Sequence, residues 1–461
     1  MQAKRWTISI IIAVSMVGWQ LIAQMPSAGA RPSQDNAAKD RLAGLTWTIA
    51  IVDEAQDAGT GSSVALDAAG YPHISYFELG AASSLKHAHW TPSQQWQTEY
   101  VDLAQPGAVS YFSSLALDAF GNPCIAYRDE AQKDLKYAYW TGDRWEIVTV
   151  DAAGDVGSYV SLALDAYDMP HISYYDSTNA DLKYAHWTDL DGWQIETVDS
   201  EGEVGKYSAL ALDSQDRPHI AYRDSVNSAL KYAFWNGSGW QRVVADDEGD
   251  VGNHASIALN GNDKPFISYG YSDDVNDWLK LWRWTDAAPT TEVVDNSGHV
   301  GAYTSLAIDS LGNPHISYYE WDTALKYVRQ VNGVWETPVV VDSFRDVGGY
   351  TSLALDSVGN PNISYYDFIG HDLRFAKAGG SALPTATATS VRQGMAATRT
   401  RTPTATRTFT PGPTPDGSTT PSADGTPTPT ATPTATATRN AWQGTGTPAG
   451  PFLPLLLRSG A

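Results

Sequence analysis

The chain has 461 residues, with 52 acidic and 30 basic side chains, a formal net charge of −22 and a single cysteine. An acidic surface repels nucleic acid and anionic membranes, so the composition excludes both as expected partners. One cysteine excludes any disulfide within the chain. Residues 381–461 contribute +4 and residues 1–40 contribute +2, so the segment between them carries −28.

The first 30 residues have the pattern of a secretory signal peptide. Lys4 and Arg5 form a basic start, and an apolar stretch follows over residues 8–22. Ala28-Gly29-Ala30 fits the small-residue rule for signal-peptide cleavage. We therefore expect an exported protein, extracellular or at the cell surface.

An uncleaved membrane anchor is the alternative interpretation of this start, and Gln20 within the apolar stretch counts against it. No later stretch approaches the roughly 18 to 20 apolar residues that a membrane helix needs. We expect a mature chain from Arg31, with a linker over residues 31–45 and no membrane span after cleavage.

A phrase close to S-L-A-L-D-x-x-G-N-P-H-I-S-Y-Y-D recurs seven times between residues 62 and 378. Successive copies are 47 to 51 residues apart. The fifth copy carries Asn260, and the other six copies carry an aspartate at the same place: Asp67, Asp118, Asp165, Asp213, Asp309 and Asp356. Such a period is typical of repeats that bury their apolar faces only by packing on their neighbours.

Each copy contains four short segments with strand character and no amphipathic helix. In the third copy they cover residues 161–165, 171–176, 182–187 and 193–199. Tight turns rich in Gly, Asn and Pro separate them, and the aspartate at the strand end suits capping of the turn amides. The sequence predicts an all-β, seven-bladed β-propeller over residues 46–379, with the first strand of each blade lining the channel.

The two ends of the repeat region complement each other. The seventh copy stops after its third strand, near Ala378, and an orphan fourth strand stands at residues 46–53. That orphan matches the fourth strands of other copies, such as residues 145–151. We expect the N-terminal strand to complete the last blade, because an unpaired edge would invite aggregation.

In blade layout and aromatic richness, residues 46–378 resemble the sialidase-like and fucose-lectin-like bacterial propellers. The sialidase Asp-box, S-x-D-x-G-x-x-W, is not reproduced: the turn after Asp309 reads Ser-Leu-Gly-Asn-Pro-His and lacks its aromatic. The resemblance therefore implies a propeller and a glycan-binding or glycan-cleaving relative, and it assigns no catalytic residue to this chain.

Acidic loops follow the fourth strands and supply candidate cation ligands. Carboxylate oxygens suit Ca²⁺. The candidates are Asp151, Asp155, Asp199, Glu203, Asp246 and Asp250. The alternative is a solvated acidic face without metal, because exposed like charges ~10 Å apart repel by only ~0.4 kcal/mol in water. We expect no cofactor other than this Ca²⁺.

An aromatic position lies six residues before the recurring aspartate (Asp165 in the third copy), which we call the anchoring aspartate. Seven-fold symmetry would gather these side chains around the channel mouth, as a collar that stacks on a ligand or as packing between blades. Its members are Phe112, Tyr159, Tyr207, His254, Tyr303 and Tyr350, with Gly61 in the first copy. Departures from the repeat add four further ligand-binding candidates: Arg128, Arg223, Tyr271 and Trp278.

Two other recurring features are expected to be structural. The loop between the second and third strands pairs an acid with a base, as Asp129 with Lys136, which is typical of a cross-strand ion pair. His73, His171, His219 and His315 each stand alone beside a turn, and we expect them to form hydrogen bonds within the fold.

The composition changes near Gly379. Residues 380–450 are dominated by Pro, Thr and Ala, which predicts a disordered, extended stalk. Residues 451–461 form a short apolar tag, too short to span a bilayer.

Regular blades favour several similar shallow sites over one asymmetric catalytic cluster. The sequence therefore indicates a monomeric, non-catalytic binding propeller whose multivalent sites take glycans or extracellular proteins. The alternative is a sialidase-like glycoside hydrolase on the same fold.

Overall fold

The computed structural model describes residues 45–80, 83–93, 95–103, 111–273 and 275–379. The predicted signal peptide (1–30), stalk (380–450) and C-terminal tag (451–461) lie outside these residues, as does the linker apart from Leu45. Within the described ranges, no helix is long and apolar enough to cross a membrane.

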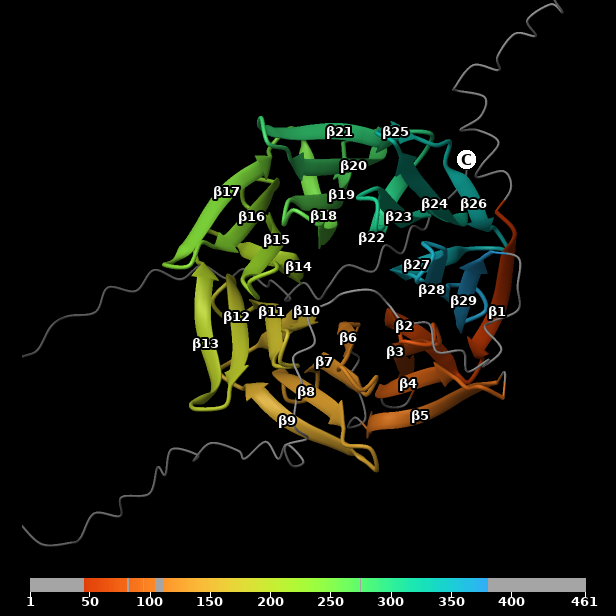
Figure 1. The fold of residues 1–461 in the computed structure, drawn as a ribbon, viewed down its shortest axis with the longest axis horizontal. Helices are drawn as coiled ribbons and strands as arrows, with labels where there is room; N and C mark the ends of the chain where they lie inside the picture. The colour runs from red at the N-terminus through yellow and green to blue at the C-terminus, as the bar shows by residue number, and fades with distance from the viewer. Residues whose placement is uncertain (1–44, 81–82, 94, 104–110, 274, 380–461) are drawn as a thin grey trace, which may run out of the picture. The chain divides into compact units, whose positions relative to one another are not determined.

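Seven antiparallel sheets stand around a common axis as the blades of a propeller (Figure 1). The innermost strands of blades 1 to 7 are β2 (Asp57–Leu66), β6 (Ser113–Leu117), β10 (Val156–Leu164), β14 (Val204–Leu212), β18 (Asp250–Leu259), β22 (Val300–Ile308) and β27 (Val347–Leu355). The second strands are β3 (Pro72–Leu79), β7 (Pro123–Asp129), β11 (Pro170–Asp176), β15 (Pro218–Asp224), β19 (Pro265–Ser272), β23 (Pro314–Glu320) and β28 (Pro361–Asp367).

The third strands are β4 (Ser84–Trp90), β8 (Asp134–Trp140), β12 (Asp181–Thr188), β16 (Ala229–Trp235), β20 (Asp277–Trp284), β24 (Ala324–Val331) and β29 (Asp372–Ala378). The outermost strands are β5 (Trp96–Leu103), β9 (Trp145–Asp151), β13 (Gly192–Asp199), β17 (Trp240–Asp246), β21 (Pro289–Asp295), β25 (Val334–Trp335) with β26 (Val339–Asp342), and β1 (Trp47–Asp53). In blade 6 the outermost position is split into β25 and β26, and Pro338, which lacks an N–H, lies between them.

The N-terminal strand closes the ring, as predicted. β1 pairs antiparallel with β29, with Trp47 opposite Ala378 and Ile51 opposite Arg374. Figure 1 shows the red β1 beside the blue β29 in blade 7. The first and last strands of the propeller therefore share one sheet, and the third strand of blade 7 has no free edge.

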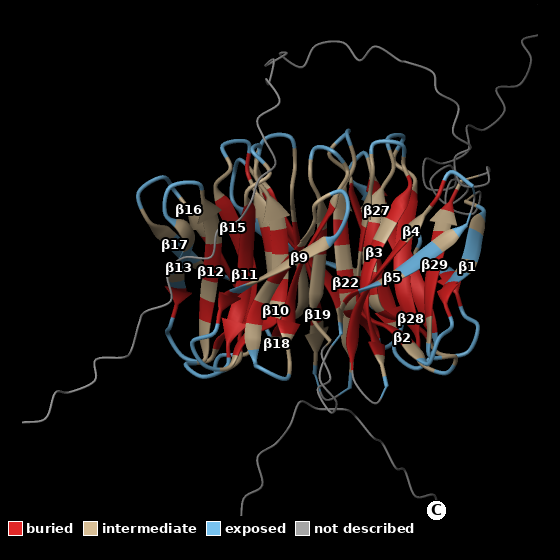
Figure 2. Ribbon diagram, turned by 90° about the horizontal axis from the view of Figure 1, so that it is seen from below, coloured by how far each residue is buried: buried red, intermediate tan, exposed pale blue. Residues whose placement is uncertain are grey.

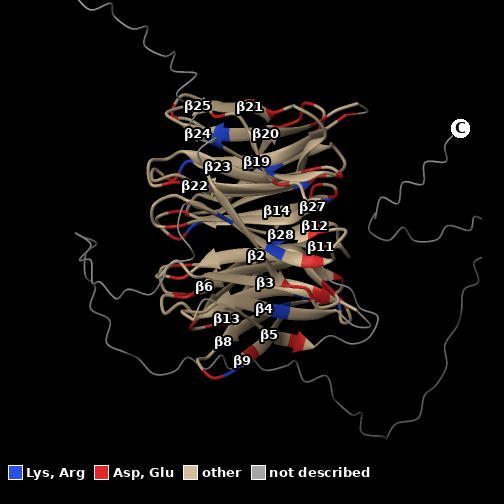
Figure 3. Cartoon of the chain, turned by 90° about the vertical axis from the view of Figure 1, so that its right-hand side faces the viewer, with Lys and Arg blue, Asp and Glu red and all other residues tan. Residues whose placement is uncertain are grey.

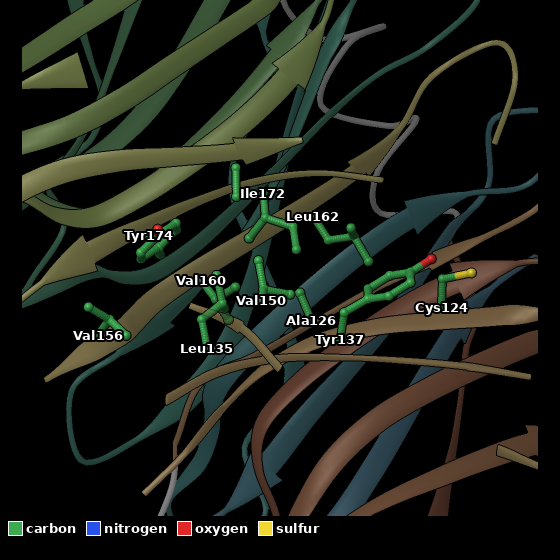
Figure 4. Packing of buried hydrophobic residues seen from close by; sticks show 11 residues of the cluster. Cys124, Ala126, Leu135, Tyr137, Val150, Val156, Val160, Leu162, Ile172 and Tyr174 are labelled. Carbon is green, nitrogen blue, oxygen red and sulfur yellow. The ribbon is translucent and has the colours of Figure 1, made fainter. Parts of the chain in front are cut away.

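The core lies between neighbouring blades. Second strands are buried on both faces, since each is covered by a blade on either side; every residue of β11 is buried. Figure 2 shows buried strands and exposed loops at both ends of the ring. Figure 4 shows the cluster between blades 2 and 3, which contains Leu135 and Tyr137 of blade 2 and Ile172 of blade 3. Cys124 belongs to this cluster, and burial raises the pKa of its thiol to about 12.

The anchoring aspartates cap turns, as expected. Asp309 Oδ1 accepts hydrogen bonds from the backbone N–H of Leu311 at 2.9 Å and of Asn313 at 2.8 Å. Gly312 within this turn has φ +83°, a conformation that favours glycine. The repeated D-x-x-G-N-P phrase is thus explained by one turn geometry.

The innermost strands begin earlier than the sequence pattern indicates. In blade 3 the strand starts at Val156, five residues before the predicted start at Ser161. The pairing with β11 shifts twice between these two residues, and Tyr159 has φ +53°. Such bulges interrupt the alternation of inward and outward side chains, so a period of two does not reveal this part of the strand.

Candidate functional site

One end of the propeller carries two sets of loops, and we call it the crossover face. The first set joins the outermost strand of one blade to the innermost strand of the next, as residues 152–155 do. The second set joins second and third strands, as residues 177–180 do. Backbone hydrogen bonds connect the sets, such as Ser177 N–H to Asp155 O at 2.7 Å. Acidic residues occur in the loops at both ends of the strands (Figure 3).

A three-residue latch joins every pair of neighbouring blades. The last aspartate of each outermost strand lies against a tyrosine from the second strand and a basic residue from the third strand of the next blade. The latches are Asp53/Tyr76/Lys86, Asp102/Tyr127/Lys136, Asp151/Tyr174/Lys183, Asp199/Tyr222/Lys231, Asp246/Tyr269/Lys280, Asp295/Tyr318/Lys326 and Asp342/Tyr365/Arg374.

The expected acid–base pair within one hairpin is present in five blades, at 2.5 to 3.9 Å, and the latch adds an aspartate of the preceding blade. Lys136 does lie 2.5 Å from Asp129, but Lys183 lies 3.9 Å from Asp176 and 2.5 Å from Asp151 of the preceding blade. The partner that recurs in all seven cases is the aspartate across the blade interface. The recurring acid and base of the repeat therefore also make contacts between blades, which the pairing within one hairpin does not predict.

Three of the Ca²⁺ candidates, Asp151, Asp199 and Asp246, are latch residues with buried carboxylates. Burial favours a raised pKa for Asp151, but hydrogen bonds from Lys183 and Tyr174 outweigh it, and the net pKa is lowered. Each of the three carboxylates holds a lysine Nζ at 2.5 Å. These oxygens are engaged in ion pairs.

The other three Ca²⁺ candidates also face cations. Asp155 lies 2.7 Å from both Arg128 and Lys133, Asp250 lies 2.5 Å from Arg223, and Glu203 lies 2.6 Å from Lys206. The predicted ligand-binding residues Arg128 and Arg223 are buried. Each also donates to a backbone carbonyl of the following innermost strand. Ca²⁺ binding in these loops stays a prediction.

The aromatic side chains come together around the axis. Ring centroids of successive members lie 4.5 to 4.7 Å apart along the series Phe112, Tyr159, Tyr207, His254, Tyr303 and Tyr350. We call these six side chains the collar. All are half-buried. Burial, with a smaller contribution from Arg223, lowers the pKa of His254 to about 4, so this member is neutral at pH 7.

The collar has a gap at blade 1 that Tyr111 occupies. A Cβ at Gly61 would fall on the Tyr111 carbonyl oxygen, and the Tyr111 ring stacks on Tyr350 at 6.4 Å. Five members of the collar have φ between +49° and +53°, which is rare for residues other than glycine. The collar rings therefore pack on one another around the axis. Ligand binding by the collar stays a prediction.

Blade 5 holds a pocket of about 430 Å³ on the crossover face. Tyr271 and Trp278 lie directly opposite each other on β19 and β20, with centroids 4.8 Å apart and planes at 19°. Lys280 Nζ lies 5.5 Å from the centre of the Tyr271 ring. The remaining lining residues come from the crossover loop and β21: Glu248, Gly249, Thr291, Glu292 and Val293.

The pocket exists because blade 5 departs from the repeat at two paired positions. Tyr271 stands where the other second strands carry Asp or Glu, as at Asp129, and Trp278 stands where blade 2 has Asp134. Two opposed acids are therefore replaced by two stacked rings, and the base of the repeat is kept as Lys280. The sequence identified both aromatic residues but missed Glu248 and Glu292, because only the folded blade brings the crossover loop and β21 beside them.

A second group was also missed. Among the described residues, a set with metal-ligating spacing is formed by His87, His89 and Glu99 of blade 1. The sequence signal that could have identified it is His87-Ala88-His89, because alternate residues of a strand lie on the same face.

No protein-family model and no curated protein matches the chain. Solved structures with a similar arrangement include the BP39L lectin from Burkholderia pseudomallei, at 14% identity over 70% of this chain and 95% of that one, with a TM-score of 0.47. A mutant Aleuria aurantia lectin in complex with Fucα1-6GlcNAc has 12% identity over 61% and 96%, with a TM-score of 0.41. The SapL1 lectin in complex with α-methyl fucoside has 13% identity over 62% and 97%, with a TM-score of 0.41. Similarity this low carries no argument about a ligand.

Proposed function

We propose that the protein binds a carbohydrate in the blade-5 pocket without cleaving it. The observation that carries this proposal is the pair of stacked rings, Tyr271 and Trp278, in a pocket of about 430 Å³. Flat aromatic faces pack on the C–H faces of sugar rings. Lys280 donates hydrogen bonds, Glu248 accepts them and a threonine hydroxyl does both, which suits sugar hydroxyls.

The volume and the asymmetry support one principal site. Pockets for small ligands are typically ~300–1,000 Å³ and combine aromatic walls with a few polar groups. The paired aromatic residues occur in blade 5 alone among the seven hairpins, where the sequence has an acid at the Tyr271 position in every other blade. Multivalent binding through the other blades, expected from their regularity, stays a prediction.

A glycan array probed with the full chain tests the proposal, with fucosides among the probes. Trp278→Ala removes one ring of the stacked pair, and we expect about a tenfold loss of affinity, or ~1.4 kcal/mol. Tyr100→Ala is the matched control, since Tyr100 is an exposed ring on β5 that lies near Lys86 of blade 1. Saturable binding that Trp278→Ala weakens and Tyr100→Ala spares supports the proposal. Absence of binding to any glycan favours a protein partner.

Glycoside hydrolysis is the second candidate, because two carboxylates, Glu248 and Glu292, line the same pocket. Glu292 lies 3.2 Å from Arg283, so one of the two is already in an ion pair. Fluorogenic glycosides separate the candidates. Turnover that Glu248→Gln abolishes would establish the enzyme, whereas binding without turnover leaves the lectin-like function.

We also propose that the protein acts outside the cell, on the strength of the charged start, the apolar stretch and the cleavage pattern over residues 1–30. Mass spectrometry of the exported protein should find Arg31 at its N-terminus. An intact N-terminal segment on membrane-associated protein would support the anchor alternative.

A further inference from the structure

Among the described residues, blade 1 alone brings three imidazoles together, whereas blade 3 has two at the equivalent positions, His171 and His186. His73 lies on β3, His87 and His89 lie on β4, and Glu99 lies on β5. The strand register places His87 opposite Glu99 and His89 opposite His73. Directly opposed residues of a sheet share a face, so all four side chains project toward the same side of the blade. Contact between His87 and Trp145 identifies this side as the one facing blade 2.

The spacing within the cluster matches a small tetrahedral ion. One ligand atom from each of His87, His89 and Glu99 lies within 4.8 Å of the others, and His87 Nδ1 is 3.1 Å from Glu99 Oε1. With bonds of ~2.0–2.1 Å, ligand atoms on a tetrahedral Zn²⁺ stand about 3.4 Å apart.

His89 has a ring nitrogen that is open to a ligand. Its Nδ1 atom is buried and has no hydrogen-bond partner among the described residues, and the same holds for His186 Nδ1 at the equivalent position of blade 3. A buried nitrogen without a partner is destabilising, and a metal ion would satisfy it.

The other blades show what the fold needs at these positions without a metal. The His87 position is Tyr137, Tyr184, Tyr232 and Tyr327 in blades 2, 3, 4 and 6. In three of those blades the tyrosine hydroxyl bonds to the histidine that corresponds to His73. Packing alone is therefore satisfied by a Tyr–His pair, and the replacement by a third imidazole calls for another explanation.

We propose that blade 1 binds one divalent transition-metal ion of the Zn²⁺ type through His87, His89 and Glu99. Imidazole nitrogens and a carboxylate are ligands that Zn²⁺ takes in proteins, and three protein ligands leave one position for water. His73 acts as a positioning residue. Its Nδ1 lies 3.1 Å from His87 Nε2, so it accepts a hydrogen bond from the Nε2–H of the His87 tautomer whose Nδ1 faces the ion.

The surroundings suit retention of an ion and access to it. The His87 side chain is 3% exposed, and the edge of Trp145 from blade 2 covers it at a centroid distance of 5.6 Å. The Glu99 side chain is 39% exposed, which gives an ion a route from solvent. The cluster lies toward the end of the ring opposite the crossover face, so its occupancy is independent of the sugar site.

Titration of the full chain with Zn²⁺ against a chelating dye tests this proposal. We expect one ion per chain. His87→Tyr restores the residue of the other blades and should lower affinity by more than ~100-fold, while His73→Asn, which copies Asn362 of blade 7, should lower it ~10–100-fold. His299→Gln is the control, since His299 is exposed and lies 2.8 Å from Asp277 outside the cluster.

Loss of the bound ion in His87→Tyr with retention in His299→Gln supports the site. Glu99→Gln, on an outer strand, provides a second ligand variant if His87→Tyr fails to fold, and thermal melts distinguish the two cases. Absence of stoichiometric Zn²⁺ binding would overturn the proposal. So would binding that persists unchanged in both ligand variants, or that His299→Gln abolishes.

Discussion

Replacing Asp246 with Ala removes the acid that joins blade 4 to blade 5. Its Oδ2 accepts from Lys280 at 2.5 Å and from the Tyr269 hydroxyl, and both charged side chains are under 10% exposed. Lys280 forms no other ion pair within 4 Å among the described residues, because Tyr271 stands where other blades have an acid. Removing one partner of a buried pair costs about 3–5 kcal/mol.

Asp53→Ala provides the internal comparison. Asp53 makes the same contacts with Lys86 and Tyr76, but Lys86 also lies 2.7 Å from Glu78. The lysine keeps a counter-ion, so we expect a smaller loss of about 1.5–3 kcal/mol, the range for hydrogen bonds to charged groups.

Urea unfolding of both variants measures the difference in free energy of unfolding, and thermal melts measure the matching shift in Tm. With an unfolding entropy of ~2.1 cal/mol/K per residue, Asp246→Ala should lower the Tm of this ring by ~4–7 °C and Asp53→Ala by ~2–4 °C. Equal losses in the two variants, or a loss under ~1 kcal/mol for Asp246→Ala, would refute the view that the latches are ion pairs on which blade packing depends.

Three further predictions concern the same ring. Because the pKa of His254 is lowered to about 4, its neutral form contributes stability above the unfolded pKa of 6.5, and this stability is lost as pH falls through 4. The pKa of Asp151 is lowered below 3.8, so its contribution to stability is lost below that pH. A urea midpoint that is flat from pH 7 to 3 would contradict this. Gly61→Ala should destabilise the ring by ~1–3 kcal/mol, since a Cβ meets the Tyr111 backbone, and an unchanged midpoint would count against the collar geometry. Deleting residues 46–53 removes β1 and should sharply lower the Tm. An unchanged Tm would contradict closure of the ring by β1.

Most of the fold can be predicted from the repeat in the sequence. Period, strand count and the displaced fourth strand lead to seven blades closed by β1, because each follows from local patterns in the chain. The bulged start of the innermost strands was missed, since residues such as Tyr159 at φ +53° break the alternation on which strand assignment depends.

The sites are harder to predict because they join segments of different blades or strands. Asp129 and Lys136 are close in sequence, which predicts their hairpin pair at 2.5 Å, but the sequence does not indicate the aspartate one blade away that also contacts the lysine. His73 reads as a lone structural residue until the register brings His87 and His89 beside it. Departures from the repeat, as at Tyr271, were the better guide.

The measurement that tests the central claim most directly is the affinity of Tyr271→Asp for the glycan that the array identifies. This variant restores the acid found in other blades, so Lys280 gains an ion pair like that of Lys136 with Asp129, and the fold is kept while the stacked rings are lost. We predict at least a tenfold weaker affinity than wild type, with an unchanged or raised Tm. Equal affinity of Tyr271→Asp and wild type would contradict carbohydrate binding in the blade-5 pocket.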